Sequence, residues 1–272
     1  MLSMGETHLR ELDLSYNSIT NDGVKELVEG LSHPSSRLKC LRLQGCGLSA
    51  PACKYLSAAM KRAPKLVELD LSCNDIGDEG LQNLSCGLKD PSCRLEGLRM
   101  NHCGLTRPSC AGIGEALGLE SSVLWELNLG NNALSDEGFQ LLCEGIRKWA
   151  TLTHLNLSHC CLSDECCDEL ASGLASSDSR ISELDLSGNE LQDRGVKKLC
   201  VGLKSRSCTL ISLALRCCEL TSKSVPVLAA ALKSNPQYLT ELHLIGNSIE
   251  DSDIGVFLEL IKNQKYALEM IE

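Results

Sequence analysis

Cysteine is the residue type in this 272-residue chain with the most obvious chemical potential, because the chain holds seventeen of them. Thiolates beside an imidazole can bind zinc, and the run from His159 to Cys167 contains four cysteines, Cys160, Cys161, Cys166 and Cys167. Structural zinc sites usually use C-x-x-C pairs, and this run has none. Cys160 and Cys167 also occupy positions that recur elsewhere in the chain. We therefore expect no metal site here.

The remaining reactive residue types do not form a recognisable catalytic pattern. The six histidines are scattered, and no candidate nucleophile has a base partner at a characteristic spacing. The chain also has no G-x-x-x-x-G-K-[ST] loop that could bind nucleotide phosphates. We expect a protein that is not an enzyme and that binds no cofactor within this chain.

The cysteines follow a long-range periodicity instead. One series is Cys46, Cys103, Cys160 and Cys218; a second, just after it, is Cys53, Cys110 and Cys167; a third, evenly spaced, is Cys86, Cys143 and Cys200. A residue that recurs at one slot is expected to be a small buried hydrophobe there. Free thiols in this number persist in a reducing compartment, which predicts a cytoplasmic protein.

The period comes from a repeated segment best represented by Ile181–Leu191, ISELDLSGNEL. Its apolar residues and Asn189 match the pattern L-x-x-L-x-L-x-x-N/C-x-L of leucine-rich repeats. Nine copies follow one another at a nearly constant spacing, and a partial tenth begins at Leu268. The nine copies begin at Leu9, Leu38, Leu66, Leu95, Leu124, Leu152, Ile181, Leu210 and Leu239.

Each copy has the pattern of a strand, a turn and a helix. Leucines alternate with polar residues across Leu184–Ser187, as in a short strand with one buried face. Val196, Leu199 and Leu203 then give the apolar stripe of a helix. By the same reasoning we expect the first helix at Asp22–Leu31 and the ninth at Ile254–Ile261. One such unit cannot bury both of its faces, but stacked copies can.

These patterns predict an α/β fold, a right-handed leucine-rich-repeat solenoid or horseshoe. Its parallel sheet would form the concave face and its helices the convex face, with nine repeats and a partial tenth. Asparagine in odd copies and cysteine in even copies would form a structural turn ladder, satisfying backbone groups of the turn and the neighbouring copy. The ladder residues are Asn17, Cys46, Asn74, Cys103, Asn132, Cys160, Asn189, Cys218 and Asn247.

No linker or change in composition interrupts the repeats, so we expect a single domain over residues 1–272. The first repeat begins at Leu9, which leaves too few residues before it for the polar cap that usually closes a solenoid. We therefore expect this domain to be cut from the C-terminal end of a longer chain. The formal net charge of −10 argues against nucleic acid as a general partner. The sequence contains no apolar run long enough to predict a membrane span.

Strict alternation of Asn and Cys copies resembles the ribonuclease-inhibitor subclass of leucine-rich repeats. The string LRELDLSYNSITNDGVKELVEGL at Leu9–Leu31 looks like the C-terminal repeat region of NOD-like receptors. That resemblance implies a cytosolic innate-immune sensor whose repeats bind a ligand or protein partner. It also implies an intramolecular contact that holds a nucleotide-binding module inactive, with ATP or ADP bound only in that upstream module.

The outward side chains of the strands are the predicted partner-binding surface on the concave face. The candidates are Asp70, Arg99, Glu126, Asn128, Asn156, Glu183, Asp185, Arg216 and His243. Asp70 would lie between Arg42 and Arg99, so we expect cross-strand ion pairs there. Glu126, Glu183 and Asp185 would be less compensated, and a basic partner would dock on them. The alternative is a self-neutralised ladder of charges that only keeps the face soluble.

Two other functions fit the repeat pattern. A free-standing inhibitor of a basic, pancreatic-type ribonuclease would suit the negative net charge. Ribonuclease inhibitor grips its enzyme through aromatic residues on the strand surface, however, and the three outward columns here contain no Trp, Tyr or Phe. The other alternative is a leucine-rich-repeat adaptor of another class, against which the Asn and Cys alternation argues.

Overall fold

The computed structural model describes residues 8–63, 65–145 and 151–272. The chain divides into two compact units, Met1–Leu134 with Leu141–Ile146, and Ser135–Gln140 with Arg147–Glu272. We call these unit 1 and unit 2 and describe each by itself. Within each unit, a repeat contributes one short strand, a turn and one helix, and the strands pair in parallel and in chain order.

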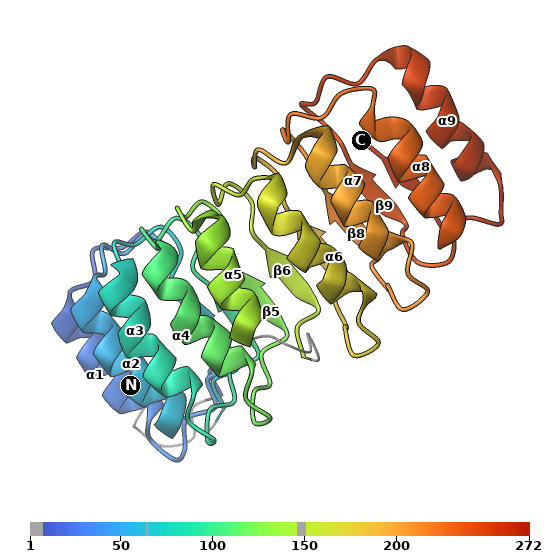
Figure 1. The fold of residues 1–272 in the computed structure, drawn as a ribbon. Helices are drawn as coiled ribbons and strands as arrows, with labels where there is room; N and C mark the ends of the chain where they lie inside the picture. Colours follow the sequence, from blue (N-terminus) through green and yellow to red (C-terminus); the bar gives the residue numbers. More distant parts are fainter. Residues whose placement is uncertain (1–7, 64, 146–150) are drawn as a thin grey trace. The chain divides into compact units, whose positions relative to one another are not determined.

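Unit 1 contains five strands that pair in parallel and in chain order. Its strands are β1 (Glu11–Asp13), β2 (Cys40–Arg42), β3 (Glu68–Asp70), β4 (Gly97–Arg99) and β5 (Glu126–Asn128). Its helices are α1 (Asn21–Leu31), α2 (Ala50–Arg62), α3 (Gly77–Leu88) and α4 (Arg107–Leu117). Helices α1 to α4 follow one another in chain order along one side (Figure 1). Helix α5 (Ser135–Gly145) contributes residues to both units.

Unit 2 repeats this arrangement. Its strands are β6 (His154–Asn156), β7 (Glu183–Asp185), β8 (Ser212–Ala214), β9 (Glu241–His243) and β10 (Met270–Ile271). A 3-10 turn, η1 (Asp164–Cys166), precedes α6 (Cys167–Ala175), and α7 (Gln192–Leu203), α8 (Ser224–Ser234) and α9 (Asp251–Lys262) follow. The partial tenth repeat supplies β10, which pairs in parallel with β9. The predicted α/β leucine-rich-repeat fold is confirmed.

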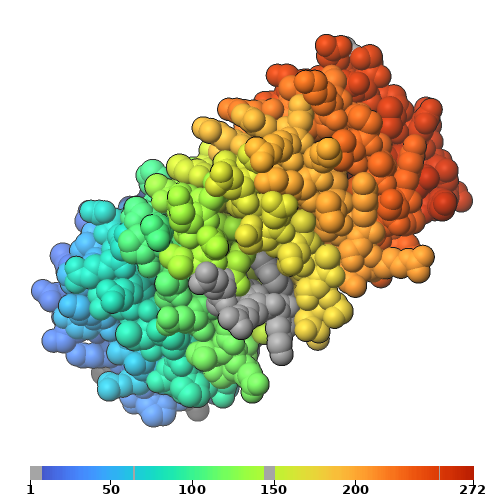
Figure 2. All heavy atoms as spheres, viewed as in Figure 1, coloured from blue at the N-terminus to red at the C-terminus, as the bar shows by residue number. Residues whose placement is uncertain are grey.

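The core of each unit lies between its strands and its helices. In the second repeat, Leu41 and Leu43 from the strand and Leu56 from the helix are all fully buried. Neighbouring helices approach closely where a glycine of one faces the backbone of the other. A Cβ on Gly202 of α7 would lie 2.5 Å from the carbonyl oxygen of Ala171 in α6. The successive colour bands of Figure 2 follow this stacking of repeats in chain order within each unit.

Two helices begin earlier than the apolar pattern predicts, because capping groups rather than apolar residues set their starts. Helix α1 begins at Asn21, where the hydroxyl of Thr20 accepts a hydrogen bond from the Gly23 N–H. Helix α9 begins at Asp251, before the first residue of the predicted stripe, and Glu250 and Asp253 form its capping box. No helix in the described part of the chain is both long and apolar enough to cross a bilayer.

Candidate functional site: the turn ladder and the sheet face

The turn asparagines of odd repeats bind the repeat that precedes them. Asn189 is 2% exposed, and its Oδ1 accepts hydrogen bonds from the backbone N–H groups of Cys160 and Leu162 at 3.0 and 3.1 Å. Its Nδ2 donates to the carbonyl oxygens of Leu157 and Leu186, both at 2.8 Å. Asn74, Asn132 and Asn247 make the equivalent four bonds.

Asn17 occupies the same slot in the first repeat but makes fewer contacts. It is exposed, and its Nδ2 donates only to the carbonyl oxygens of Leu14 and Ser15 within its own turn. The structure describes no earlier repeat whose backbone it could bind. Comparing Asn17 with Asn189 therefore separates the stability that comes from bonds within the turn from the stability that comes from bonds between repeats.

The turn cysteines of even repeats use their thiols as donors to the repeat before them. The Sγ of Cys46 donates to the carbonyl oxygen of Leu14 at 3.2 Å, and the Sγ of Cys103 donates to that of Leu71 at 3.2 Å. The Sγ of Cys218 donates to the carbonyl oxygen of Leu186 at 3.3 Å. Cys160 donates to Ser158 within its own turn at 3.5 Å. A thiol can thus satisfy one carbonyl, whereas the amide of an asparagine also satisfies two N–H groups.

All seventeen cysteines are reduced thiols, but the third series is not at one buried slot. Cys200 is buried, Cys143 is half-buried and Cys86 is exposed. Cys86 follows the turn residue Asn74 by one residue more than Cys200 follows Asn189, so Ser85 occupies the shared slot instead. One residue turns a helix by about 100°, which places Cys86 on the outer side. The prediction of a buried slot is wrong for this residue.

A second contact between repeats was not predicted. Asp193 opens α7, but its carboxylate accepts hydrogen bonds from the backbone N–H and hydroxyl of Thr221 and from the hydroxyl of Ser224, at the start of α8. Asp78 accepts equivalent bonds from Thr106 and Ser109. A Thr one repeat after each Asp, with a Ser shortly behind it, is the signal that could have revealed these pairs.

Both carboxylates respond to these contacts in the same way. Partial burial alone would raise the pKa of Asp193, but the hydrogen bonds from Ser224 and Thr221 outweigh it, and the pKa is lowered. The pKa of Asp78 is lowered by the same balance, with Ser109 and Thr106 as its donors. The ionised acids therefore stabilise the start of the next helix in place of a local cap.

We call the side of the strands that is turned away from the helices the sheet face. In unit 1, Arg42, Asp70 and Arg99 lie at aligned register positions on neighbouring strands, as predicted from the repeat. No ion pair to Asp70 exists among the described residues; its Oδ1 instead accepts the backbone N–H of Ser72 at 2.9 Å. The arginines reach the preceding column of glutamates, and Arg42 pairs with Glu11 at 3.5 Å.

Glu126 is the strongest partner of Arg99. Arg99 Nε lies 2.7 Å from Glu126 Oε1, and Arg99 Nη1 lies 3.8 Å from Glu68. The side chain of Glu126 is only 18% exposed. The prediction that Glu126 is less compensated than the other acids of this face is therefore wrong, because the arginine side chain reaches from the central column to the glutamate column. Asn128 ends its strand by accepting the Gly130 N–H at 3.0 Å.

The sheet face of unit 2 has its own pairs. Glu183 Oε1 lies 2.9 Å from His154 Nε2, a contact that was not predicted from the sequence. Asp185 accepts a hydrogen bond from Asn156 Nδ2 at 3.2 Å and from the Ser187 N–H at 2.9 Å. Neither acid has a Lys or Arg partner among the described residues.

Glu272 joins the two remaining candidates of unit 2. Its Oε2 lies 2.7 Å from Arg216 Nη2 and 2.8 Å from His243 Nδ1. Hydrogen bonds from Arg216 and His243 lower the pKa of the Glu272 carboxyl. Glu272 was not predicted as a site residue. The signal was present, because Glu272 has the same position in the partial tenth repeat, which begins at Leu268, as His243 has in the ninth, which begins at Leu239.

Within the described ranges, no three His, Cys, Asp or Glu side chains come together in a geometry that could hold a metal ion. Burial raises the pKa of Cys53, Cys103, Cys110 and Cys200 to about 12, so these thiols stay protonated at neutral pH. The sheet faces offer ion pairs, amides and hydroxyls, which suits contact with another macromolecule.

Repeated strand, turn and helix units with an Asn and Cys ladder define a leucine-rich-repeat protein, and the chain belongs to that class. The family model described as leucine rich repeat matches residues 6–28, 62–85, 121–143, 150–171 and 181–200.

Two relatives indicate which leucine-rich-repeat proteins this chain resembles. It is 40% identical to human NACHT, LRR and PYD domains-containing protein 12 over 184 residues, 67% of this chain and 17% of that protein. It is 38% identical to ribonuclease inhibitor from Sus scrofa over 185 residues, 68% of this chain and 40% of that protein. The chain therefore spans less than half the length of either relative. It is a leucine-rich-repeat protein-interaction domain similar to both.

A solved structure shares the fold at low sequence identity. The crystal structure of the Rad7 and Elc1 complex in yeast aligns with 98% of this chain and 76% of that chain, with a TM-score of 0.56 and 20% identity. This likeness concerns the fold alone.

Proposed function

We propose that this chain is the ligand-sensing and autoinhibitory repeat region of a NOD-like innate-immune receptor in the cytoplasm. It binds protein partners and is not an enzyme. One of those partners is the receptor's own nucleotide-binding module, which would hold the ATP or ADP. Similarity to proteins whose names include a NACHT domain supports this assignment over other repeat proteins. We further propose that the single domain over residues 1–272 is part of such a longer chain.

One observation carries the proposal that the sheet face is the contact surface. In unit 1, Asp70 keeps one carboxylate oxygen without a hydrogen-bond partner among the described residues, beside Arg99 and its two glutamates. Asp70 is only half-buried, so this oxygen is open to solvent and to a donor from a partner.

Photo-cross-linking in the full-length protein tests this proposal. A photoreactive residue at Asn101, on the sheet face beside Arg99, should form cross-links to the nucleotide-binding module or to another protein. The matched control is the same probe at Lys54, which is exposed on helix α2. Mass spectrometry identifies the cross-linked peptide. Equal cross-linking from both positions, or cross-links from Lys54 alone, would reject the sheet face as the contact surface.

The second candidate is a free-standing ribonuclease inhibitor, which the similarity to that protein favours. The size of the endogenous protein on an immunoblot separates the two candidates. A band far above the 29.4 kDa of this chain supports the receptor, and a band near 29.4 kDa supports the inhibitor. Titration of this chain against pancreatic ribonuclease A then tests inhibition directly. Full ribonuclease activity at excess chain would exclude the inhibitor.

A further inference from the structure

Unit 1 carries a column of basic side chains where its return loops enter the strands. Glu11, Cys40, Glu68 and Gly97 are register partners on neighbouring strands. Three positions before each of them the chain has His8, Arg37, Lys65 and Arg94, all of them exposed. Arg10 and Lys39, immediately before β1 and β2, are exposed at the same edge. We define the basic edge as Arg10, Arg37, Lys39, Lys65 and Arg94.

The basic edge is not neutralised within the described residues. None of its five members forms an ion pair there, and Arg37 instead lies 3.4 Å from the ring of His8. The acids nearest in sequence are Glu11, Glu68, Asp90 and Glu96. All four have other partners: Glu11 pairs with Arg42, and Glu68 lies 3.8 Å from Arg99. Asp90 accepts bonds from the N–H and hydroxyl of Ser92, and Glu96 accepts a bond from Trp125 Nε1.

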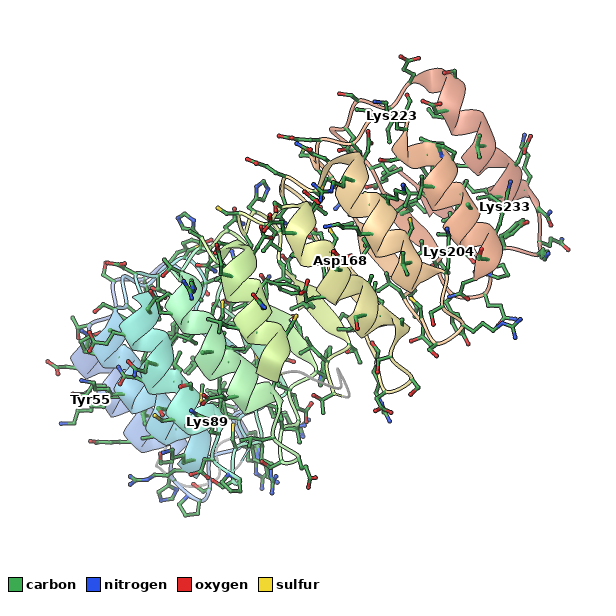
Figure 3. All side chains as sticks on the ribbon, viewed as in Figure 1. Tyr55, Lys89, Asp168, Lys204, Lys223 and Lys233 are labelled. Atoms are coloured by element: carbon green, nitrogen blue, oxygen red, sulfur yellow. The ribbon has the colours of Figure 1, made fainter. Side chains whose placement is uncertain are left out.

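Two ordinary explanations for surface cations do not account for the basic edge. Cations at helix C-termini stabilise the helix dipole, and Lys89, labelled in Figure 3, follows α3 and pairs with Glu115 at 2.8 Å. The basic edge lies outside the helices. Ion pairs between strands explain Arg42 and Arg99 on the sheet face. The cations of the basic edge have other cations beside them in their column, and like charges repel.

The arrangement is specific to unit 1. The same slot in unit 2 is occupied by Thr151, Arg180, Thr209, Tyr238 and Ala267, so it holds a single cation. A general need for solubility would not confine the cations of this slot to one unit, especially in a chain of net charge −10. The concentration of charge therefore points to an anionic ligand at this edge of unit 1.

Exposed apolar residues lie at the same edge. Val123 occupies the next position in the basic column, just before β5, and is 40% exposed. Leu119, in the same return loop, is 38% exposed. Cations mixed with exposed aliphatic side chains are typical of surfaces that bind the interface of anionic membranes. An acidic polypeptide would be attracted by the cations but would not require the aliphatic residues.

We propose that the basic edge of unit 1, with Leu119 and Val123, binds the surface of a bilayer rich in anionic phospholipid. The cations contact the phosphate and carboxylate headgroups, and the two aliphatic side chains enter the interface. The contact is peripheral and leaves the sheet face uncovered. It is independent of the protein partner proposed above, so either assignment can fail without the other.

Co-sedimentation with vesicles tests this inference. Vesicles of phosphatidylcholine and phosphatidylserine in equal parts should pellet the protein, vesicles of phosphatidylcholine alone should not, and added salt should weaken the binding. A basic residue near an anionic surface contributes roughly fivefold to binding. The triple variant Arg37→Glu, Lys65→Glu, Arg94→Glu should therefore bind at least about one-hundredfold more weakly.

Matched variants make the test specific. Arg180→Glu, Arg206→Glu and Lys233→Glu change the net charge equally at exposed positions of unit 2, and this variant should retain most of the binding. Leu119→Ser with Val123→Ser should weaken vesicle binding while keeping its dependence on phosphatidylserine. Equal losses in the two charge variants would overturn the proposal. So would binding to soluble poly-L-glutamate that depends on the basic edge without any pelleting by vesicles.

Discussion

Replacing Asn189 by alanine should destabilise unit 2 far more than a typical change of one polar residue. The substitution removes two hydrogen bonds to backbone N–H groups and two to carbonyl oxygens, all at 2.8–3.1 Å in a side chain that is 2% exposed. Each such bond contributes about 1 kcal/mol, and a buried group left without a partner costs about 1–3 kcal/mol. We expect a loss of roughly 4 kcal/mol in the free energy of unfolding.

Asn17→Ala is the matched control, because Asn17 is an exposed turn asparagine with two hydrogen bonds inside its own turn. Its loss should cost less than about 1 kcal/mol. Asn189→Cys supplies the residue of the even repeats, but a thiol cannot accept two N–H bonds and donate two others. That variant should remain nearly as unstable as Asn189→Ala.

Urea unfolding followed by circular dichroism measures the three free energies. Amide hydrogen exchange at Cys160 and Leu162 reports the same loss locally, because these N–H groups donate to Asn189. A cost below about 1 kcal/mol for Asn189→Ala, or a cost equal to that of Asn17→Ala, would falsify the view that these asparagines join successive repeats.

Three further predictions concern other contacts. Asp193→Asn should destabilise the protein at neutral pH, and the difference from wild type should vanish in acid. The lowered pKa of Asp193 gives stability that is present above the usual value of about 3.8 and is lost as the pH falls through the folded pKa. A difference in urea unfolding that does not change with pH would contradict this. Iodoacetamide at pH 8 should modify the exposed Cys86 and Cys217 in the native state. It should modify Cys200, whose pKa is raised to about 12, only after unfolding. Mass spectrometry after brief labelling shows which of these cysteines carry the label. Gly188→Ala should lower the melting temperature, because Gly188 has a φ of +70° and a Cβ there would overlap the ring of His159. Adding His159→Ala to this variant removes the overlap and should restore only part of the lost stability. Full restoration would show that the positive φ costs alanine nothing.

The alternation of Asn and Cys is the part of the candidate site that the sequence predicted best in position. A turn residue that recurs once in every copy must face its equivalents in the neighbouring copies, as Asn189 faces the turn of Cys160. The sequence could not show that the amide makes four bonds, whereas the thiol donates its single hydrogen to a carbonyl oxygen. That difference depends on which backbone groups lie within reach.

The charges of the sheet face were harder to predict. Register alone placed Asp70 beside Arg99, but the carboxylate of Asp70 binds its own Ser72 N–H, and Arg99 reaches Glu126. Long side chains choose among several partners of similar distance, and local backbone bonds compete with ion pairs. Position in a repeat therefore fixes the column of a residue but not its partner.

The sequence by itself determined the repeat, the order of strand, turn and helix, and the parallel pairing of strands, because a unit this short can bury every apolar face only by stacking on its neighbours. Tertiary structure decided the contacts between residues in different copies. Asp193 stabilises the start of α8 rather than its own helix, Glu272 joins Arg216 to His243, and a basic edge forms from residues of successive copies. These contacts join side chains that come within a few ångströms only when the copies stack, and no local pattern encodes that distance.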